Sequence, residues 1–399
     1  MYPAPSNGTR AKHITSILLL LALSVAHTST ALSSTAGASL TVEELGRMLF
    51  FDTNLSRNRT QSCATCHVPS RAFSDPRDNG VGGAASLGDD GQSLGDRNTP
   101  TAMYARFSPG FHETDEGMKV GGQFLDGRAR NLAEQAAGPP LNPIEMNMPD
   151  VASVVARIEE NPVYLAAFRD QFGDAVFDQP KTAFVAMTES IAAFERTGEF
   201  APFDSKYDRF LRGEAQLTEQ EDLGMTLFFS RQFTNCNLCH QLRRSPAAER
   251  ETFTNYEYHN IGVPRNLSLR TADAKDPEFV DRGLLDNPSV DEMQAAGRFK
   301  VPTLRNVAVT PPYMHNGVFE DLRTVILFYN KYNSRSESRQ INPETGARWA
   351  PPEVPENLSI EELETGPSLD DQRVDALVAF LKALTDRRYE HLLSSSPSR

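Results

Sequence analysis

The 399-residue chain has little cysteine, little tryptophan and no excess of positive charge. It contains four cysteines and one tryptophan, and 40 Lys and Arg residues are outnumbered by 53 Asp and Glu residues, for a formal net charge of −13. Proteins that bind nucleic acid through a basic face need the opposite balance, so we expect no nucleic-acid partner. With 39% hydrophobic and 23% charged residues, the composition is typical of a globular protein long enough for two domains.

Long hydrophobic runs are also scarce, and the most prominent one lies at the N-terminus. Basic residues and a histidine within positions 10–13 precede an apolar run over 14–26, and small residues follow over 28–34. This order is typical of a secretory signal peptide, and the run is short for a membrane span. We therefore predict a signal peptide over residues 1–35 and a periplasmic location, with an uncleaved membrane anchor as the alternative.

The four cysteines form two copies of one motif, Cys63-Ala64-Thr65-Cys66-His67 and Cys236-Asn237-Leu238-Cys239-His240. A Cys-x-x-Cys disulfide closes a very small loop and stabilises little. Zinc needs four ligands, so two distant Cys2His sets would leave two half-sites. Neither alternative explains a histidine after both pairs, whereas c-type haem attachment uses all three residues. We predict two covalent c-type haems, with His67 and His240 as the proximal iron ligands.

Each motif follows a similar segment, starting at Thr41 and at Thr218. Both segments carry Leu-Gly, then Leu-Phe-Phe, then CxxCH, and both open with a capping-box pattern, Thr41 with Glu44 and Thr218 with Glu221. The repeat predicts two copies of one small helical module.

Helical spacing recurs in later segments, and no segment alternates convincingly as a strand. The predicted helices include residues 151–172, 181–196 and 322–332. Long loops rich in Gly, Pro and Asn lie between them, and wrapping a large flat cofactor would account for their length. The sequence therefore predicts an all-α fold.

Longer motifs resemble the bacterial diheme cytochrome c peroxidase and MauG family. They are, in order, GDRNTPT (95–101), FLDGRARNLAEQAAGPPLNPIEM (124–146), CNLCH and GRFKVPTLRNVAVTPPYMHNG (297–317). The resemblance implies two cytochrome c-like domains, each with one covalently bound c-type haem. We place an N-terminal domain with the peroxidatic haem at 36–200, and a C-terminal domain with the electron-transfer haem at 201–390.

The resemblance also implies roles for single residues. Glu145 matches the family's distal glutamate, which moves a proton between the two oxygens of peroxide, and Gln135 matches a neighbouring amide that hydrogen-bonds the bound ligand. Tyr329 matches an axial ligand of the second haem, where peroxidases carry methionine and MauG-like members carry tyrosine. Met314 is the alternative ligand.

Three further positions match those where family members hold a calcium ion between the domains. They are Asn98, Thr310 and Pro312. Calcium takes oxygen ligands, including backbone carbonyls. Ordinary loop hydrogen bonding is the alternative.

The chain departs from many family members at two points. No histidine lies between Val68 and Phe111, where many peroxidases carry a mobile histidine that closes the first haem. We infer that the first haem is open, with His112 as the alternative second ligand. Leu125 stands where many members have a tryptophan between the haems, and the single tryptophan, Trp349, lies far along the chain.

The leading prediction is a periplasmic diheme peroxidase that reduces hydrogen peroxide with electrons from a small redox protein, either a cytochrome c or a cupredoxin. One alternative is a MauG-like oxidase that modifies residues of a partner protein through high-valent iron. Another is a non-enzymatic diheme electron carrier. Tyr329 favours the oxidase, Leu125 counts against it, and the missing histidine counts against the carrier. A homodimer is compatible with the leading prediction.

Overall fold

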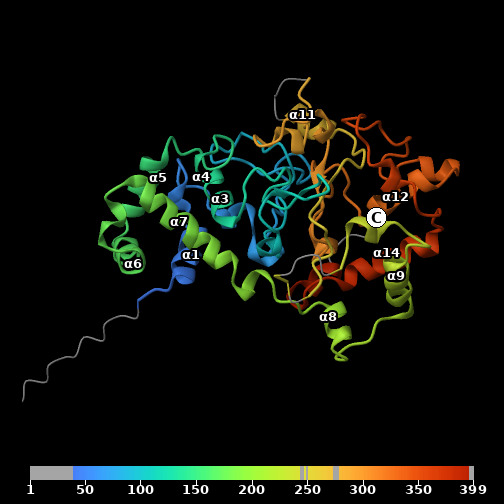
Figure 1. The fold of residues 1–399 in the computed structure, drawn as a ribbon, viewed down its shortest axis with the longest axis horizontal. Coiled ribbons are helices and arrows are strands. Elements are labelled where there is room, and N and C mark those ends of the chain that lie inside the picture. Colours follow the sequence, from blue (N-terminus) through green and yellow to red (C-terminus); the bar gives the residue numbers. More distant parts are fainter. Residues whose placement is uncertain (1–38, 243–246, 249, 273–277, 395–399) are drawn as a thin grey trace, which may run out of the picture. The chain divides into compact units, whose positions relative to one another are not determined.

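The computed structural model describes residues 39–242, 247–248, 250–272 and 278–394 (Figure 1). The predicted signal peptide, residues 1–35, lies outside these described residues. Within them, no helix is both long enough and apolar enough to cross a membrane.

The described chain is rich in helix and poor in strand, which confirms the predicted helical class. The α-helices are α1 Val42–Phe50, α2 Cys63–Cys66, α3 Leu132–Ala136, α4 Gly138–Leu141, α5 Val151–Glu159, α6 Pro162–Phe172, α7 Pro180–Glu195, α8 Lys206–Leu211, α9 Glu219–Phe229, α10 Cys236–Cys239, α11 Leu267–Ala272, α12 Leu322–Asn333, α13 Ile360–Leu363 and α14 Asp371–Ala383. The strands are β1 His112–Glu113, β2 Lys119–Val120, β3 Tyr258–His259 and β4 Phe299–Lys300. β1 pairs with β2 and β3 with β4, both antiparallel.

One predicted helix is in fact two. The segment 151–172 divides into α5 and α6 at Asn161, whose side chain accepts a hydrogen bond from the backbone N–H of Val163 at 2.9 Å. Pro162 occupies the first position of α6, where its missing N–H leaves no intrahelical bond unmade. The helical periodicity continues across this break, so it did not reveal the new start.

The two copies of the repeat begin in the same way. In α1, the backbone N–H of Glu44 donates to Thr41 Oγ1 at 3.2 Å, and the N–H of Thr41 donates to Glu44 Oε2 at 2.9 Å. In α9, Thr218 and Glu221 make the same pair of bonds at 3.2 and 2.7 Å. Both predicted capping boxes are confirmed.

The glycine of each Leu-Gly pair lies where two helices approach closely. A Cβ atom at Gly46 of α1 would lie 1.8 Å from the carbonyl oxygen of Ser190 in α7. A Cβ atom at Gly224 of α9 would lie 1.9 Å from the carbonyl oxygen of Ala376 in α14. The repeat therefore encodes the same backbone-to-backbone helix contact twice.

We expect Gly46→Ala to lower the free energy of unfolding by about 3 kcal/mol or more, because the added methyl group has to push two helix backbones apart. Gly198→Ala is the control, since Gly198 is exposed and a Cβ atom added there would have no neighbouring atom within 4 Å. Denaturant unfolding of both variants tests this. Equal stability of the two would contradict the close helix contact.

Buried side chains form two main hydrophobic clusters. The first contains mostly buried residues from Leu45 to Phe203, joined by Tyr256 and Val309 from later in the chain, and the second contains buried residues from Tyr207 to Leu384. The change from one to the other lies close to the predicted domain boundary at 200/201, which remains a prediction. Beyond α14 the chain returns to the first cluster, where Tyr389 and Leu392 are buried.

Candidate haem-binding sites

The first CxxCH motif and the two predicted catalytic residues line one cavity. Its lining includes Cys63, Cys66, His67, Gln135 and Glu145, around about 1720 Å³ free of protein atoms, part of it open to solvent. α2 carries the cysteines, α3 carries the glutamine, and the glutamate follows α4. The structure thus brings together residues that lie up to 82 positions apart (63 to 145).

The second CxxCH motif lines another cavity. The lining includes Cys236, Cys239 and His240, together with Met314 and Tyr329, around about 1680 Å³ free of protein atoms, part of it open to solvent. Both candidate axial residues therefore border the same space as the proximal histidine. Tyr329 as the axial ligand of the second haem, with Met314 as the alternative, remains a prediction.

The two motif histidines are held in the same way. The Nδ1 atom of His67 lies 3.0 Å from the carbonyl oxygen of Phe73, and the Nδ1 atom of His240 lies 2.9 Å from that of Phe253. A carbonyl only accepts, so Nδ1–H donates in both cases and Nε2 is left as the metal-binding nitrogen. Burial lowers the pKa of His67 and lowers that of His240 to about 4, which favours the neutral imidazole that binds iron.

Both sites fit a c-type haem by the chemistry of their donors. Each offers two unpaired thiols, one turn apart, and an imidazole oriented by a backbone carbonyl. Burial raises the pKa of Cys63 above its ordinary range and raises that of Cys236 to about 11. Burial therefore favours the protonated form of these two thiols as free side chains.

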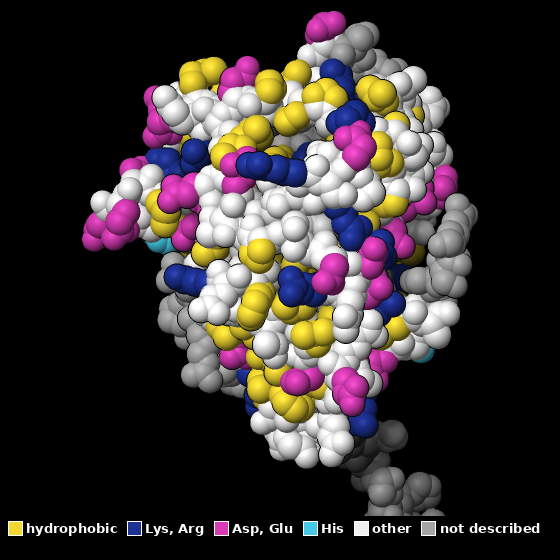
Figure 2. Space-filling model, turned by 90° about the vertical axis from the view of Figure 1, so that its right-hand side faces the viewer, with side chains coloured by type: hydrophobic (Ala, Val, Ile, Leu, Met, Phe, Trp, Pro, Cys, Tyr) yellow, Lys and Arg dark blue, Asp and Glu magenta, His cyan; other side chains and the backbone are white. Residues whose placement is uncertain are grey.

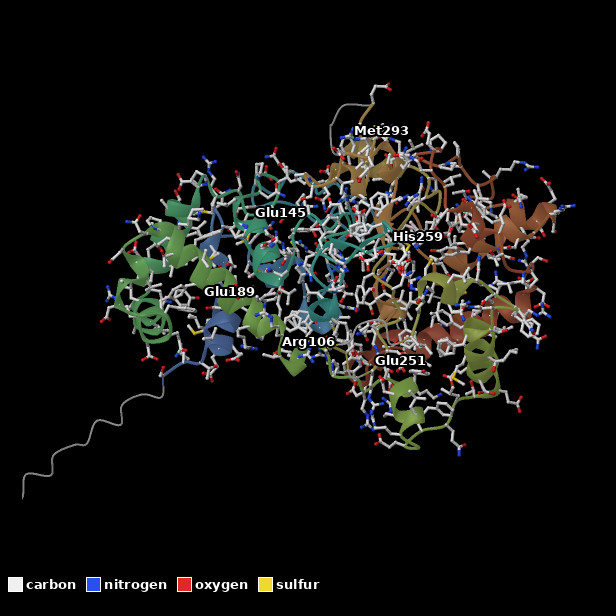
Figure 3. All side chains as sticks on the ribbon, in the orientation of Figure 1. Arg106, Glu145, Glu189, Glu251, His259 and Met293 are labelled. Carbon is white, nitrogen blue, oxygen red and sulfur yellow. The ribbon has the colours of Figure 1, made fainter. Side chains whose placement is uncertain are left out.

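Glu145, labelled in Figure 3, lines the first cavity and is held there by hydrogen bonds from its neighbours. Its Oε1 accepts a hydrogen bond from Asn142 Nδ2 at 2.8 Å, and its carbonyl oxygen accepts from the N–H of Asp89 at 2.7 Å. Burial raises the pKa of Glu145, while the Asn142 hydrogen bond opposes that rise. A carboxyl group with a raised pKa keeps its proton to a higher pH than an exposed glutamate does, which suits a general acid. Sequence reasoning missed Asn142, although it lies in the same LNPIEM motif.

A second carboxyl group in the first cavity was not predicted. Glu195, the last residue of α7, lines this cavity and is 7% exposed. Its Oε2 atom is buried without a hydrogen-bond partner, and burial raises its pKa to about 8. The one sequence signal is an acidic residue at a helix C-terminus, where negative charge is unfavourable.

Glu195 should make the stability of the protein depend on pH. The folded state keeps its proton up to about pH 8, whereas the unfolded state loses it above about 4.5. The stability that this proton contributes is complete below pH 4.5 and is lost as the pH rises to 8. We expect Glu195→Gln to gain stability relative to the wild type over this interval, by up to about 1.4 kcal/mol per pH unit.

Unfolding free energies of the wild type and Glu195→Gln at several pH values test this. A difference that does not change between pH 5 and pH 8 would mean that the folded protein carries Glu195 as a carboxylate.

The predicted calcium residues lie partly together. Asn98 Nδ2 donates to the carbonyl oxygen of Gly83 at 3.2 Å, and Pro312 packs against the same glycine. The hydroxyl of Thr310 instead donates within its own turn, to the carbonyl oxygens of Asn306 and Val307 at 3.4 and 3.3 Å. The calcium site remains a prediction.

The space between the two cavities is bordered by Leu125 and Asp281, which line both. Arg97 holds this region together, because its guanidinium donates to Asp281 at 2.6 and 2.7 Å and to Asp126 at 2.6 Å. Trp349 lines neither cavity and packs against Phe319 and Phe328 instead.

The alternative closing ligand, His112, lies in β1 and is exposed. Its Nδ1 donates to the carbonyl oxygen of Gly110 at 2.7 Å. Among the described residues that line the first cavity, His67 is the histidine.

The fold and the two motif-lined cavities define an oxidoreductase of the haem-peroxidase class, and comparisons with known proteins agree. Residues 41–216 match the model of the family described as di-haem cytochrome c peroxidase. The chain is 59% identical over 352 residues to the methylamine utilization protein MauG of Paracoccus denitrificans, covering 88% of this chain and 90% of that protein. The cytochrome c551 peroxidase of Nitrosomonas europaea is 32% identical over 281 residues, which is 69% of this chain and 68% of that one.

Two solved structures of related proteins are also similar to this chain. The diheme peroxidase BthA of Burkholderia thailandensis is 34% identical, with a TM-score of 0.78 over 90% of this chain and 88% of that chain. A MauG-like protein associated with microbial copper homeostasis is 30% identical, with a TM-score of 0.63 over 87% and 92%. The chain belongs to the di-haem cytochrome c peroxidase and MauG family.

Proposed function

We propose that the protein is a periplasmic di-haem oxidase of the MauG type, which uses hydrogen peroxide to oxidise residues of a partner protein. The observation that carries this choice is Tyr329, whose side chain borders the second cavity together with His240. The 59% identity to a MauG, against 32% to a peroxidase, supports the same choice. The N-terminal segment is the proposed export signal.

The two CxxCH motifs would hold the haems, through the four cysteines and the two histidines. When bound, the haems would supply iron centres that take up peroxide at the first site and exchange electrons through the second.

At the first cavity, side chains of the protein itself would transfer the protons that peroxide cleavage requires. Cleaving peroxide into water requires a proton to leave one oxygen and reach the other, and a carboxyl group can serve both transfers. Glu145 is oriented for this by Asn142, and burial raises its pKa, which favours the protonated form. Gln135 borders the same space and offers an amide that can donate to a bound oxygen.

A second function is catalytic reduction of hydrogen peroxide with electrons from a small cytochrome c or cupredoxin. Met314 favours it, because a thioether raises the reduction potential of a haem and this side chain borders the second cavity.

Steady-state kinetics separate the two functions. The ferric holoprotein is mixed with peroxide and a reduced cytochrome c, or a reduced cupredoxin, and donor oxidation is followed. Slow donor turnover with rapid, stoichiometric peroxide consumption supports the oxidase. Sustained donor oxidation supports the peroxidase, and no peroxide consumption would overturn both functions.

The axial ligand of the second haem is tested by a matched pair of variants. If Tyr329 binds the iron, Tyr329→Met should raise the reduction potential of that haem, because a phenolate favours ferric iron and a thioether does not. Met314→Leu should then leave the potential unchanged. Redox titration measures both, and the opposite pattern would assign Met314 as the ligand.

A further inference from the structure

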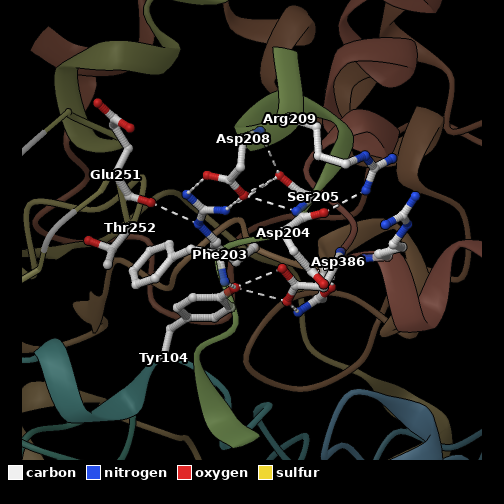
Figure 4. Close-up of polar contacts among 12 residues, drawn as sticks. Tyr104, Phe203, Asp204, Ser205, Asp208, Arg209, Glu251, Thr252 and Asp386 are labelled. Atoms are coloured by element: carbon white, nitrogen blue, oxygen red, sulfur yellow. Dashed lines mark hydrogen bonds and ion pairs between the residues drawn. The ribbon is translucent and has the colours of Figure 1, made fainter. Parts of the chain in front are cut away.

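A buried tyrosine and a buried aspartate form a hydrogen-bonded pair that lines neither cavity (Figure 4). Tyr104 is 2% exposed and Asp386 is fully buried, and the phenol oxygen lies 2.8 and 2.9 Å from the two carboxylate oxygens. Asn306 holds the aspartate, because its Nδ2 donates to Oδ2 at 2.7 Å and its Oδ1 accepts from the N–H of Asp386 at 2.8 Å. The phenol therefore donates its proton toward a fixed base.

A short path connects this tyrosine to the first motif. His67 donates from Nδ1 to the carbonyl oxygen of Phe73, and the N–H of Ala102 donates to the same oxygen at 3.1 Å. Ala102 lies two residues before Tyr104, so two hydrogen bonds and a short piece of backbone join the imidazole to the tyrosine. The N–H of Tyr104 also donates to the carbonyl oxygen of Phe200 at 2.9 Å. The ring centres of Phe200 and Phe73 lie 4.2 Å apart.

Aromatic contacts continue from the tyrosine toward the second motif. The guanidinium of Arg305 lies 5.2 Å from the ring centre of Tyr104 and 5.4 Å from that of Phe253. The carbonyl oxygen of Phe253 accepts the hydrogen bond from Nδ1 of His240. Tyr104 thus occupies a middle position in a chain of buried contacts between the two predicted proximal histidines.

We propose that Tyr104 is an internal redox site that gives up one electron when hydrogen peroxide is present and no reduced partner is bound. This inference rests on the proposed function. The phenol loses one electron to the haem pair, and its proton moves to Asp386, which leaves a neutral tyrosyl radical. One hydrogen peroxide takes up two electrons and two protons to form two waters. Tyr104 supplies one electron, and a ferric haem iron supplies the other and becomes iron(IV). Solvent supplies the two protons.

The surroundings favour this step over the loss of an electron alone. A tyrosine oxidised without losing its proton would place a new positive charge in an apolar core, which is costly. Transfer to the aspartate instead changes the pair from one negative charge to none. Burial raises the pKa of Asp386 to about 6, so at neutral pH the carboxylate is charged and is a better base than an exposed aspartate. The cation of Arg305 is already balanced by Asp208.

Electron paramagnetic resonance of the holoprotein tests the proposal. The protein is frozen shortly after peroxide addition without a reductant, with ordinary tyrosine and with ring-deuterated tyrosine. We expect an organic-radical signal that narrows on deuteration and is lost in Tyr104→Phe. Tyr164→Phe is the matched control, since Tyr164 is also buried and donates to a carboxylate, Asp52, at 2.9 Å. This control should keep the signal.

The variant Asp386→Asn provides a second test of whether Asp386 accepts the proton of Tyr104. Asparagine keeps an oxygen that accepts from Tyr104 but is too weak a base to take its proton, so the radical should be lost while haem absorption and far-UV circular dichroism are retained. A radical that persists in Tyr104→Phe, or its absence in a wild type that consumes peroxide, would overturn the inference alone. A wild type that consumes no peroxide would overturn the proposed function, and this inference with it.

Discussion

Glu145→Gln is expected to slow peroxide consumption by about 10²- to 10⁴-fold, because glutamine cannot pass a proton between the two peroxide oxygens. The amide is close to the carboxyl in shape and can keep the hydrogen bond from Asn142, so the cavity should stay intact. Haem content and haem absorption should therefore match the wild type. Stopped-flow measurement of peroxide consumption by the ferric protein gives the rate.

Glu134→Gln is the control for this variant. Glu134 is a neighbouring glutamate on α3, but it is exposed, and its Oε2 accepts from the backbone N–H of Arg130. It should consume peroxide at the wild-type rate. A Glu145→Gln rate within about threefold of the wild type would be too small a change for loss of a general acid–base group, and the proton would then have to come from another group. Glu195 would be the first residue to examine, because it borders the same cavity.

Short motifs allowed the chemistry of this protein to be predicted, because c-type haem attachment uses residues within a few positions of one another. The CxxCH motifs named two cysteines and a histidine that line each cavity, and the capping boxes predicted the starts of α1 and α9. Glu145 and Gln135 were placed by resemblance alone, since no spacing rule joins them to a cysteine motif. Their meeting at one cavity supports the roles that the resemblance implies.

What the sequence did not reveal depends on contacts between distant segments. Glu195 ends an ordinary amphipathic helix, and its burial in the first cavity depends on how α7 packs. Tyr104 and Asp386 lie 282 positions apart, in segments that carry no motif of their own. The two-residue strands were also missed, because alternation cannot be recognised over two positions.

Arg305, whose guanidinium packs over the ring of Tyr104, forms a fully buried ion pair with Asp208. Breaking this pair should have the largest effect on the free energy of unfolding. Arg305 and Asp208 are both 0% exposed, and the guanidinium donates to the two carboxylate oxygens at 2.5 and 3.0 Å. Its Nε also donates to the carbonyl oxygen of Glu251 at 2.8 Å. Burial would raise the pKa of Asp208, but hydrogen bonds from Arg305 lower it overall, so the carboxylate stays charged.

We expect Arg305→Met to lower the free energy of unfolding by about 3–5 kcal/mol, because it leaves the Asp208 carboxylate buried without its counter-charge. Arg59→Met is the matched control: Arg59 makes an equally bidentate pair with Glu160, at 2.8 and 2.9 Å, but both side chains are about half exposed. Removing that surface pair should cost no more than about 1 kcal/mol. Denaturant unfolding of the holoprotein, followed by far-UV circular dichroism, measures both.

The double variant Arg305→Met with Asp208→Leu separates the cost of the stranded charge from the loss of the pair itself. Removing both charges should recover much of the stability lost in Arg305→Met, since a buried ion pair contributes little over apolar side chains of similar size. Arg305 also packs against the rings of Tyr104, Phe203 and Phe253, and methionine can keep part of that contact. If the double variant is as unstable as Arg305→Met, these ring contacts and the bond to Glu251, rather than the charge of Asp208, stabilise this part of the core.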